Sequence, residues 1–232
     1  MEIIYKPDSA ALDEIAIQIF TDTTKKVLGE KHFAVWALPG GRSVPAIFNK
    51  LSSISDIDWK RVHFFMVDER LVPIDDMESN YRLLKETLLD KLLEKELITH
   101  NNIHPFIFRP GKKDPGTISY RAELEKFGGS YDLVFLSSGE DGHIAGLYPA
   151  HHSIEDNAPF FLTMDDSPKL PVDRMTSSRS LILRSRSSIL LFYGNTKRDA
   201  LDLFKNNNIS YIDCPAKITY QIKHSYALTD QR

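Results

Sequence analysis

The chain has 232 residues and a formal net charge of −3 at pH 7, with 42% hydrophobic and 26% charged residues. The length and composition are typical of one α/β domain with a sizeable core, so we expect a single domain over residues 1–232. The slightly negative net charge gives little support to nucleic-acid binding or a membrane-surface role. Cys214 is the only cysteine, which excludes intrachain disulfides and cysteine metal clusters. No apolar run reaches membrane-spanning length, and the N-terminal segment lacks the features of a secretory leader, so we expect a cytoplasmic protein.

Short apolar segments alternate with segments of helical periodicity along the whole chain. The apolar segments predict strands at 3–5, 33–38, 62–67, 103–108, 133–136, 157–164, 189–193 and 226–229. The periodic segments predict helices at 9–29, 45–51, 80–92, 118–127, 197–204 and 216–222. This alternation indicates a sheet covered on both faces, so the predicted fold class is α/β, a three-layer Rossmann-like fold with a mainly parallel sheet.

A glycine turn follows the predicted strand 33–38 and precedes a helix. Its residues are Gly40, Gly41, Arg42 and Ser43. Free N–H groups and the dipole at the start of the next helix suit a phosphate, and Ser43 can cap the helix or bind the anion. An ordinary strand-to-helix turn is the alternative, since the segment is neither a Walker loop nor a dinucleotide motif. Gly194 and Lys197 repeat this arrangement after the strand 189–193.

Charged side chains follow two further predicted strands. After 62–67 come Asp68, Glu69 and Arg70, which form either part of a site or a solvated turn. After 133–136 come two glycines, an acid and an imidazole that titrates near neutrality, where a polar turn is the alternative. These residues are Gly139, Asp141, Gly142 and His143. Because ligands of open α/β sheets bind beyond the carboxyl ends of the strands, we expect the segments after all four strands to converge on one crevice.

Two other polar segments have plainer interpretations. His151 and His152 are adjacent, so they do not share a helix face as zinc-binding histidines four residues apart do, and no carboxylate spacing nearby completes a metal site. We therefore predict no metal and no cofactor. Residues 165–173 predict a surface loop. The segment that follows forms either a basic rim or a solvated face, with arginines at Arg174, Arg179, Arg184 and Arg186.

In these segments the chain resembles the 6-phosphogluconolactonase family, within the larger group that includes glucosamine-6-phosphate deaminases. Members typically show Asp-Glu-Arg-x-Val-Pro followed by Ser-Asn-Tyr, which this chain matches at 68–73 and 79–81. They show Leu-Gly-x-Gly-x-Asp-Gly-His-x-Ala-x-Leu-Phe-Pro, matched over 136–149 with departures at Ser137, Gly146 and Tyr148. Weaker matches are a Gly-Gly-Ser-Thr-Pro loop, altered by Arg42 and Val44, an Arg-x-Thr segment at 174–176 and a Gly-x-x-Lys segment at 194–197.

The resemblance implies hydrolysis of 6-phosphoglucono-1,5-lactone, a small sugar phosphate lactone, to 6-phosphogluconate in the pentose phosphate pathway. His143 would take a proton from water and later protonate the ring oxygen, while Asp141 or Asp68 orients the imidazole. Arg70 or backbone N–H groups of the glycine loops would stabilise the oxyanion. The phosphate would bind at the 40–43 loop and Lys197, with Arg174 as a further candidate.

Two alternatives remain. A deaminase-type aldose–ketose isomerase would use Asp68 to remove a proton from carbon and His143 to open the ring. Deaminases resemble Asp-Glu-Tyr at the first motif and Phe-Asn-Glu-Pro after the second, whereas this chain has Arg70 and the segment 146–149 there. We expect Arg70 to pair with Asp68 and lower its basicity, which favours the lactonase. A non-catalytic sugar-phosphate sensor would lack His143 or the acids, and this chain keeps them.

Overall fold

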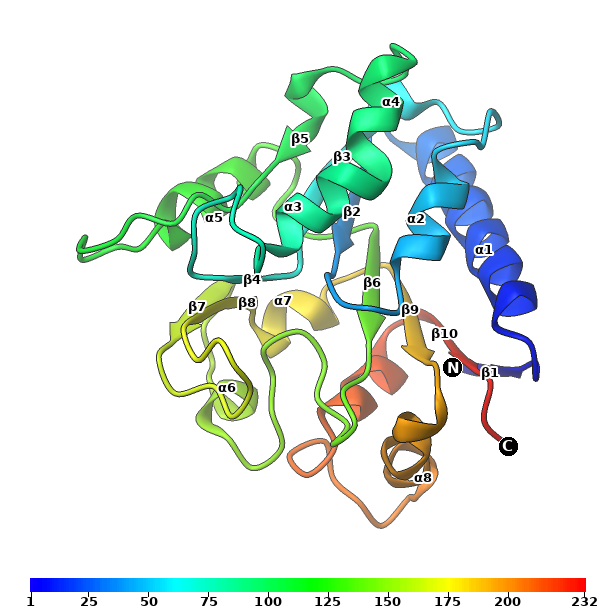
Figure 1. Cartoon of the computed structure of the whole chain (residues 1–232), viewed down its shortest axis with the longest axis vertical. Coiled ribbons are helices and arrows are strands. Elements are labelled where there is room, and N and C mark those ends of the chain that lie inside the picture. Colours follow the sequence, from blue (N-terminus) through cyan, green and yellow to red (C-terminus); the bar gives the residue numbers. More distant parts are fainter.

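A computed structural model that covers residues 1–232 places a seven-stranded sheet at the centre of the molecule (Figure 1). Every neighbouring pair of strands is parallel, which confirms the predicted α/β class. Side by side, the strands are β1 (Glu2–Tyr5), β10 (His224–Thr229), β9 (Ser187–Phe192), β6 (Leu133–Ser137), β2 (Ala34–Leu38), β3 (Val62–Met66) and β5 (Ile103–His104). The chain proceeds from β2 toward β3 in one direction and from β6 toward β9 in the other, so the topology switches between β2 and β6.

Helices cover both faces of this sheet, as the alternating sequence pattern predicts. One face is covered by α1 (Ser9–Glu30), α2 (Pro45–Leu51), α3 (Asn80–Leu84) and α4 (Asp90–Glu94), the last two joined by a π-helical turn at Lys85–Leu89. The other face is covered by α5 (Thr117–Glu125), α7 (Arg179–Leu183), α8 (Arg198–Lys205) and a 3₁₀ helix at Pro215–Gln221. The four-residue α6 (His152–Glu155) lies beyond the carboxyl edge of the sheet (Figure 1).

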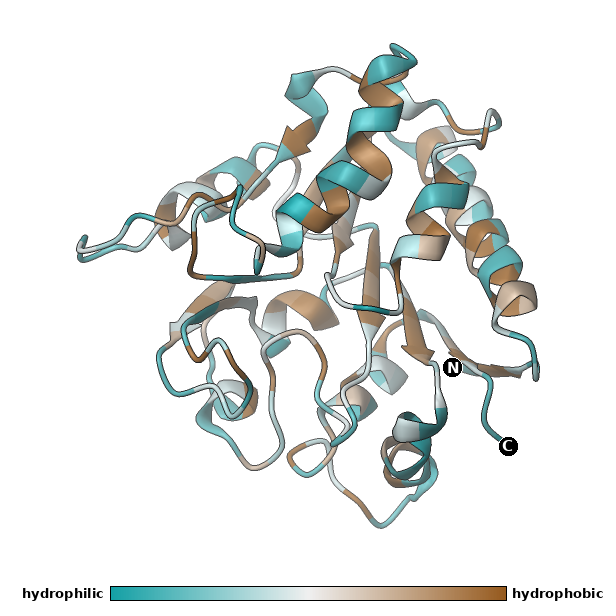
Figure 2. Cartoon of the chain, in the orientation of Figure 1, coloured by the Kyte–Doolittle hydropathy of each residue, from teal (hydrophilic) through white to brown (hydrophobic).

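Successive side chains of each strand enter two separate cores. In β2, Trp36 packs on the α1 side of the sheet, with its ring 4.7 Å from that of Phe20, whereas Val35 and Ala37 pack on the α5 side. The strands are accordingly hydrophobic along their length, while the helices carry hydrophobic and polar stripes (Figure 2). Burial on both faces explains why the strand segments appear in the sequence as continuous apolar runs.

A second, antiparallel sheet stands beside the carboxyl ends of the first. It consists of β4 (Asp68–Arg70), β8 (Arg174–Ser177) and β7 (Phe161–Met164), in that order. The interpretation of 68–70 as a solvated turn is therefore wrong, because these residues pair with 174–176 and Glu69 is fully buried. The pairing joins two motifs that lie about a hundred residues apart in sequence.

Several predicted boundaries shift for identifiable reasons. The strand expected at 103–108 shortens to β5, because Pro105 has no N–H to continue the ladder. Asp8 and Ser79 cap their helices as their residue types predict, by accepting the N–H groups of Ala10 and Arg82. Ser43 caps no helix, since Val44 precedes α2 and makes no side-chain cap.

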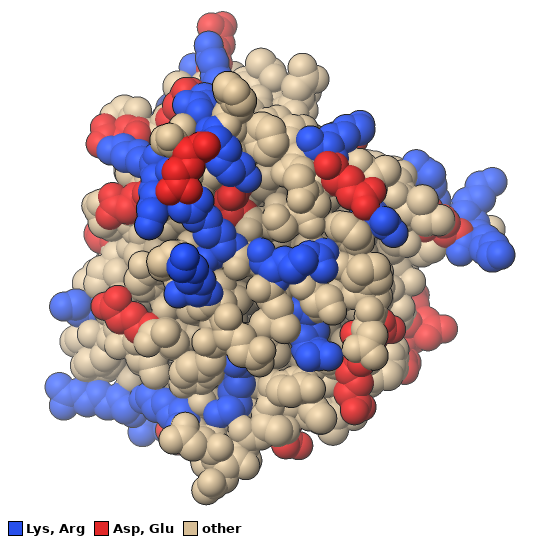
Figure 3. All heavy atoms as spheres, turned by 180° about the vertical axis from the view of Figure 1, so that it is seen from behind, with Lys and Arg blue, Asp and Glu red and all other residues tan.

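The surface carries no single dominant charge on the face opposite to that of Figure 1. Basic side chains there are separated by uncharged atoms and by acidic side chains (Figure 3). None of the helices combines the length and the hydropathy needed to cross a membrane.

Candidate active site

Four strand ends meet at one edge of the sheet. Because β9, β6, β2 and β3 are neighbours, the segments that follow them lie around one opening at the topological switch between β6 and β2. They border a cavity of about 870 Å³, a size typical of small-molecule sites. The predicted site residues that line this cavity are Gly40, Gly41, Arg42, Ser43, Asp68, Arg70, Gly139, His143, Arg174 and Lys197.

His143, which lines the cavity, forms a hydrogen-bonded pair with Asp141. The Nδ1 atom of His143 lies 2.5 Å from Oδ1 of Asp141, and the same oxygen accepts the backbone N–H of His143 at 3.1 Å. Burial is the largest single influence and would raise the pKa of Asp141, but the two hydrogen bonds from His143 and the positive charges of His143 and Lys169 together hold the pKa well below its ordinary value. An ionised carboxylate only accepts, so Nδ1 carries the ring proton. The Nε2 atom of neutral His143 is therefore available as a base.

The turn between β6 and His143 depends on the absence of side chains. A Cβ atom at position 139 would lie only 2.0 Å from Nδ1 of His143, so glycine is needed for the imidazole to approach. The N–H of Gly139 also donates to the carbonyl of His143 at 2.7 Å. Gly142 does not line the cavity; it has a φ of +84° and lies against Cys214.

Asp68 is buried in the cavity wall beside His143. Burial raises the pKa of Asp68, although the positive charges of Arg70 and Arg174 oppose this. Arg70 lowers the pKa of Asp68, as expected from the sequence, but desolvation of the carboxylate is the larger effect. The expected ion pair between the two residues does not form, and Arg70 instead lies 3.7 Å from the carboxylate of Glu78. The Nδ2 atom of Asn80 donates to the carboxylate of Asp68 at 3.2 Å and to its main-chain carbonyl at 3.1 Å.

Glu69 organises the first motif without lining the cavity. Its Oε1 atom accepts the backbone N–H groups of Arg70 and Asn80, both at 2.7 Å. Its Oε2 atom accepts the N–H of Tyr81 at 2.8 Å and the hydroxyl of Ser79 at 3.1 Å. One buried carboxylate therefore fastens β4 to the start of α3. This explains physically why Asp-Glu-Arg and Ser-Asn-Tyr occur together in the chain.

Arg70 and Arg174 lie directly opposite each other on β4 and β8. Like charges in this position destabilise a sheet. Arg174 is only 5% exposed and donates to the carbonyls of Pro171 and Leu170 at 3.0 and 2.9 Å. Arg70 donates to the carbonyl of Glu78, and its buried Nε atom has no hydrogen-bond partner. Two guanidinium groups beside the cavity thus favour an anionic group in the ligand.

A further set of cations lines the cavity, namely Arg42, Lys169 and Lys197. Burial lowers the pKa of Lys197, while the carboxylates of Glu140 and Asp141 act in the opposite direction. The Nζ atom of Lys169 lies 3.7 Å from Oδ2 of Asp141. Sequence reasoning missed Lys169, because it comes from the 165–173 loop, whose composition indicates only a surface segment.

The remaining arginines of the 174–188 segment lie away from the cavity. Arg179 and Arg184 stack over the rings of Tyr211 and Phe160, at 5.1 and 4.9 Å, and Arg186 pairs with Glu30 at 2.5 Å. The segment is therefore not a basic rim of the cavity, since Arg174 alone reaches the site. Residues 175–178 are buried, whereas Arg184 is exposed to solvent.

Sequence reasoning also missed three neighbours of the reacting groups. Asn80 holds Asp68, and a Cβ atom at Gly40 would lie 1.9 Å from its Oδ1 atom, so glycine permits the close approach of the 40–43 loop. Tyr148 packs against His143 with the ring centroids 4.9 Å apart. The motifs that contain Asn80 and Tyr148 were a usable signal. Glu140, which also lines the cavity, lies in the same 136–149 motif but at one of its variable positions.

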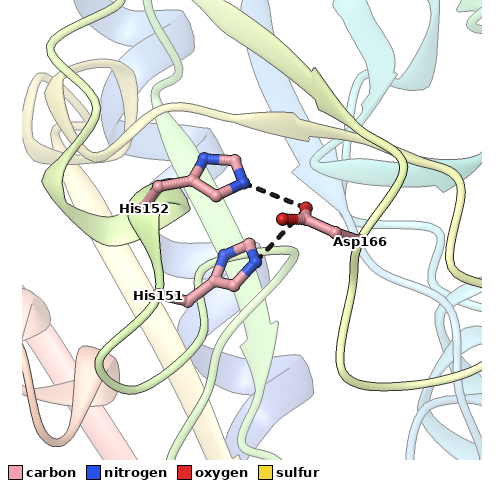
Figure 4. Close-up of side chains that lie close together, drawn as sticks. All are labelled: His151, His152 and Asp166. Atoms are coloured by element: carbon pink, nitrogen blue, oxygen red, sulfur yellow. Dashed lines mark hydrogen bonds and ion pairs between the residues drawn. The ribbon is translucent and has the colours of Figure 1, made fainter.

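A separate cluster of possible metal ligands lies outside the cavity lining. Asp166 lies within 3.3 Å of the imidazole nitrogens of both His151 and His152 (Figure 4). The sequence-based statement that no carboxylate accompanies this histidine pair is therefore wrong. Asp166 is thirteen or more residues away in the chain and is brought there by the loop that follows β7.

Comparisons with known proteins agree with this architecture. The family model described as glucosamine-6-phosphate isomerases/6-phosphogluconolactonase matches residues 7–226. The chain is 31% identical over 232 residues to a 6-phosphogluconolactonase of Borreliella burgdorferi, covering 99% of this chain and 96% of that protein. Among solved structures, a 6-phosphogluconolactonase from Thermotoga maritima superposes with a TM-score of 0.84 at 24% identity, covering 100% and 99% of the two chains. A monomeric glucosamine-6-phosphate deaminase superposes with a TM-score of 0.81 at 20% identity, covering 100% and 98%.

Proposed function

Because this chain belongs to the family of glucosamine-6-phosphate isomerases and 6-phosphogluconolactonases, we propose that it hydrolyses 6-phosphoglucono-1,5-lactone to 6-phosphogluconate in the pentose phosphate pathway. The relative from Borreliella burgdorferi, which aligns with nearly the whole of this chain, is a 6-phosphogluconolactonase, whereas a glucosamine-6-phosphate deaminase shares the fold. The choice between the two reactions therefore depends on the site. The observation that carries the proposal is the bond between Nδ1 of His143 and Asp141, which leaves Nε2 free to accept a proton.

His143 acts first as a base and then as an acid. Its Nε2 atom takes a proton from a water molecule while the water oxygen attacks C1 of the lactone. The imidazolium that forms is stabilised by the ionised carboxylate of Asp141 at 2.5 Å. As the tetrahedral intermediate collapses, the C1–O5 bond breaks and Nε2 returns the proton to the ring oxygen. The product is a single open-chain hydroxy acid, whose new carboxyl group loses its proton to solvent.

The negative charge on the former carbonyl oxygen requires donors that are already in place. Arg70 is one of the residues that line the cavity. Its Nε–H group is buried and has no hydrogen-bond partner in the protein. The N–H groups of the 39–43 loop are the alternative donors. A preorganised donor in a partly dry site stabilises an oxyanion without reorganisation at the moment of reaction. Arg70 is therefore our first candidate for this role.

The phosphate is assigned to the cations at the other strand ends. Arg42, Ser43 and Lys197 line the cavity with the backbone of Gly40 and Gly41, and Arg174 is a further candidate. Binding the phosphate fixes the far end of the substrate and so positions C1 against His143. No step in this scheme uses a metal or a nicotinamide, because the lactone carbonyl is already electrophilic and needs only proton transfer and charge stabilisation.

The deaminase reaction is the second candidate, and one observation favours it. Burial raises the pKa of Asp68, and a carboxylate of raised basicity is better suited to removing a proton from carbon. Two assays of the purified protein separate the reactions. Acid formation from 6-phosphoglucono-1,5-lactone above the spontaneous rate supports the lactonase. Release of ammonia and fructose 6-phosphate from glucosamine 6-phosphate, without lactone turnover, supports the deaminase.

The proposal also covers the domain organisation and the cellular location of the protein. We propose that residues 1–232 act as one catalytic domain, since the matched family model extends over most of the chain and one sheet organises it. We also propose a cytoplasmic location with no nucleic-acid partner, on the grounds of composition. Fractionation of cells that express the natural protein, followed by immunodetection, tests the location.

A further inference from the structure

His151, His152 and Asp166 bring three metal-binding side chains to one point (Figure 4). The Nε2 atoms of His152 and His151 lie 3.0 and 3.3 Å from the same carboxylate oxygen of Asp166. All three ligand atoms lie within 4.8 Å of one another. Ligands at 2.0–2.1 Å from a tetrahedral ion are about 3.3 Å apart, so the two nitrogen–oxygen distances match one ion bound between them.

The Nε2 atom of His151 is buried and faces Asp166 without forming a hydrogen bond to it. The side chain of His151 is 15% exposed, and Nε2 lies 3.3 Å from Oδ1 of Asp166, a contact that is an ion pair only when the imidazole is protonated. A buried polar atom without a partner is costly unless a ligand occupies the position it faces. His152, in contrast, already interacts with Asp166 through its Nε2 atom at 3.0 Å.

The other nitrogen of His151 has the support that a metal-bound imidazole needs. Its Nδ1 atom lies 2.9 Å from Oγ of Ser153 and 3.2 Å from the backbone nitrogen of that residue. With a metal on Nε2, Nδ1 carries the proton and donates to Oγ, in place of accepting the backbone N–H. The hydroxyl of Ser153 can accept this bond together with the N–H of Tyr148, which lies 3.1 Å away, because a hydroxyl has two lone pairs.

We propose that His151, His152 and Asp166 form a binding site for one divalent transition-metal ion, separate from the catalytic pair. Two imidazoles and one carboxylate are a ligand set that suits Zn²⁺, with the fourth position open to water. Oxygen-preferring ions such as Mg²⁺ are poor candidates for it.

The position of the site gives the ion a structural consequence. Asp166 is the second residue of the loop 165–173, which carries Lys169 into the cavity and holds Arg174 through the carbonyls of Leu170 and Pro171. His151 lies 5.8 Å from Tyr148, whose ring packs against His143. A bound ion therefore fastens the loop that supplies Lys169 and holds Arg174 to the segment that carries the catalytic histidine.

Titration of the full chain with Zn²⁺ tests the site. Calorimetry at pH 7.5 in a non-chelating buffer is expected to show one ion bound per chain, and Co²⁺ in its place is expected to show the visible absorption of a four-coordinate ion. Asp166→Ala and His152→Ala should each weaken Zn²⁺ binding by about a hundredfold or more, since even outer-shell changes cost about ten- to a hundredfold. His100→Ala, which removes an exposed imidazole elsewhere, is the matched control and should bind as the wild type does.

Hydrogen exchange of residues 165–173 reports the second part of the proposal. Zn²⁺ should slow exchange in this loop for the wild type and not for Asp166→Ala. Absence of a saturable one-to-one titration overturns the site, as does binding that both variants retain. Binding that disappears in His143→Ala places the ion in the catalytic cavity and overturns it as well. Binding without slower exchange refutes the fastening of the loop.

Discussion

Replacement of His143 by alanine tests the proposed mechanism most directly. The change removes the Nε2 base and leaves the carboxylate of Asp141 without its imidazole. A positioned general base contributes about 10²- to 10⁴-fold, so lactone kcat should fall by at least a hundredfold, or about 2.7 kcal/mol of barrier. The fold should survive, because the side chain is 20% exposed and hydrogen-bonds only to Asp141. We expect the free energy of unfolding to change by about 1 kcal/mol at most.

The partner variant Asp141→Asn shows whether the two residues act as one unit. Loss of a charge-assisted hydrogen bond costs about 1.5–3 kcal/mol, which predicts a decrease in kcat of about ten- to a hundredfold. Because Asp141 acts through His143, the double variant should be no slower than His143→Ala alone. The assay is acid release in a pH-stat with freshly prepared lactone, with spontaneous hydrolysis subtracted and His100→Ala as the control. Near wild-type turnover in His143→Ala, or additive losses in the double variant, would refute the reasoning.

Four further predictions follow from other parts of the molecule. Lys197→Ala should mainly raise KM for the phosphorylated lactone and leave the poor turnover of unphosphorylated gluconolactone unchanged. An equal fractional loss of activity on both lactones would show that Lys197 does not bind the phosphate. Arg70→Tyr should impair lactone hydrolysis through loss of an oxyanion donor without creating ammonia release from glucosamine 6-phosphate, and retained lactonase kcat would contradict this role. Exhaustive chelation should leave lactone hydrolysis in place, so that a loss restored by a divalent ion in Asp166→Ala as well as in the wild type would show a metal in the reaction. Burial lowers the pKa of His104 from 6.5 to about 4; unfolded chains then bind more protons, so the contribution of neutral His104 to stability is complete above pH 6.5 and is lost as the pH falls toward 4. Urea unfolding at pH 7 and pH 4.5 should show a smaller difference for His104→Gln than for the wild type, and equal differences would exclude His104 as the cause.

The buried environment of His104 gives this last prediction its structural basis. Its Nε2 atom lies 2.9 Å from Nδ1 of His63, and its Nδ1 atom lies 3.1 Å from Oε1 of Glu123. Protonation of both rings would leave two N–H groups facing each other. Glutamine is therefore a useful replacement, since it keeps hydrogen-bonding capacity but does not titrate.

The class of fold could be predicted from local pattern because the two periodicities are local properties. A strand buried on both faces needs a run of apolar residues, and a helix that covers it needs one apolar stripe. The strands 33–38, 62–67 and 189–193 were found within a residue or two for this reason. The strand at 103–108 was overestimated, because the apolar run continues past Pro105 although the ladder does not.

Much of the site was also visible in the chain, since the carboxyl ends of neighbouring parallel strands must share one edge. Gly40, His143 and Lys197 could be assigned to a common crevice without knowing the order of the strands. Sequence patterns did not show that the pKa of Asp68 is raised, because desolvation depends on everything packed around the carboxyl group. The predicted lowering by Arg70 has the right sign, but burial outweighs it.

The sequence by itself thus determined the α/β class, the positions of the turn glycines and the presence of an imidazole beside an acid. Only the tertiary structure decided which side chains from distant segments meet them. It paired Arg70 with Arg174 across a second sheet, brought Lys169 to Asp141, and set Asp166 against His151. Those contacts join residues far apart along the chain, and they are decided by how the helices and loops pack over the sheet, which no local periodicity encodes.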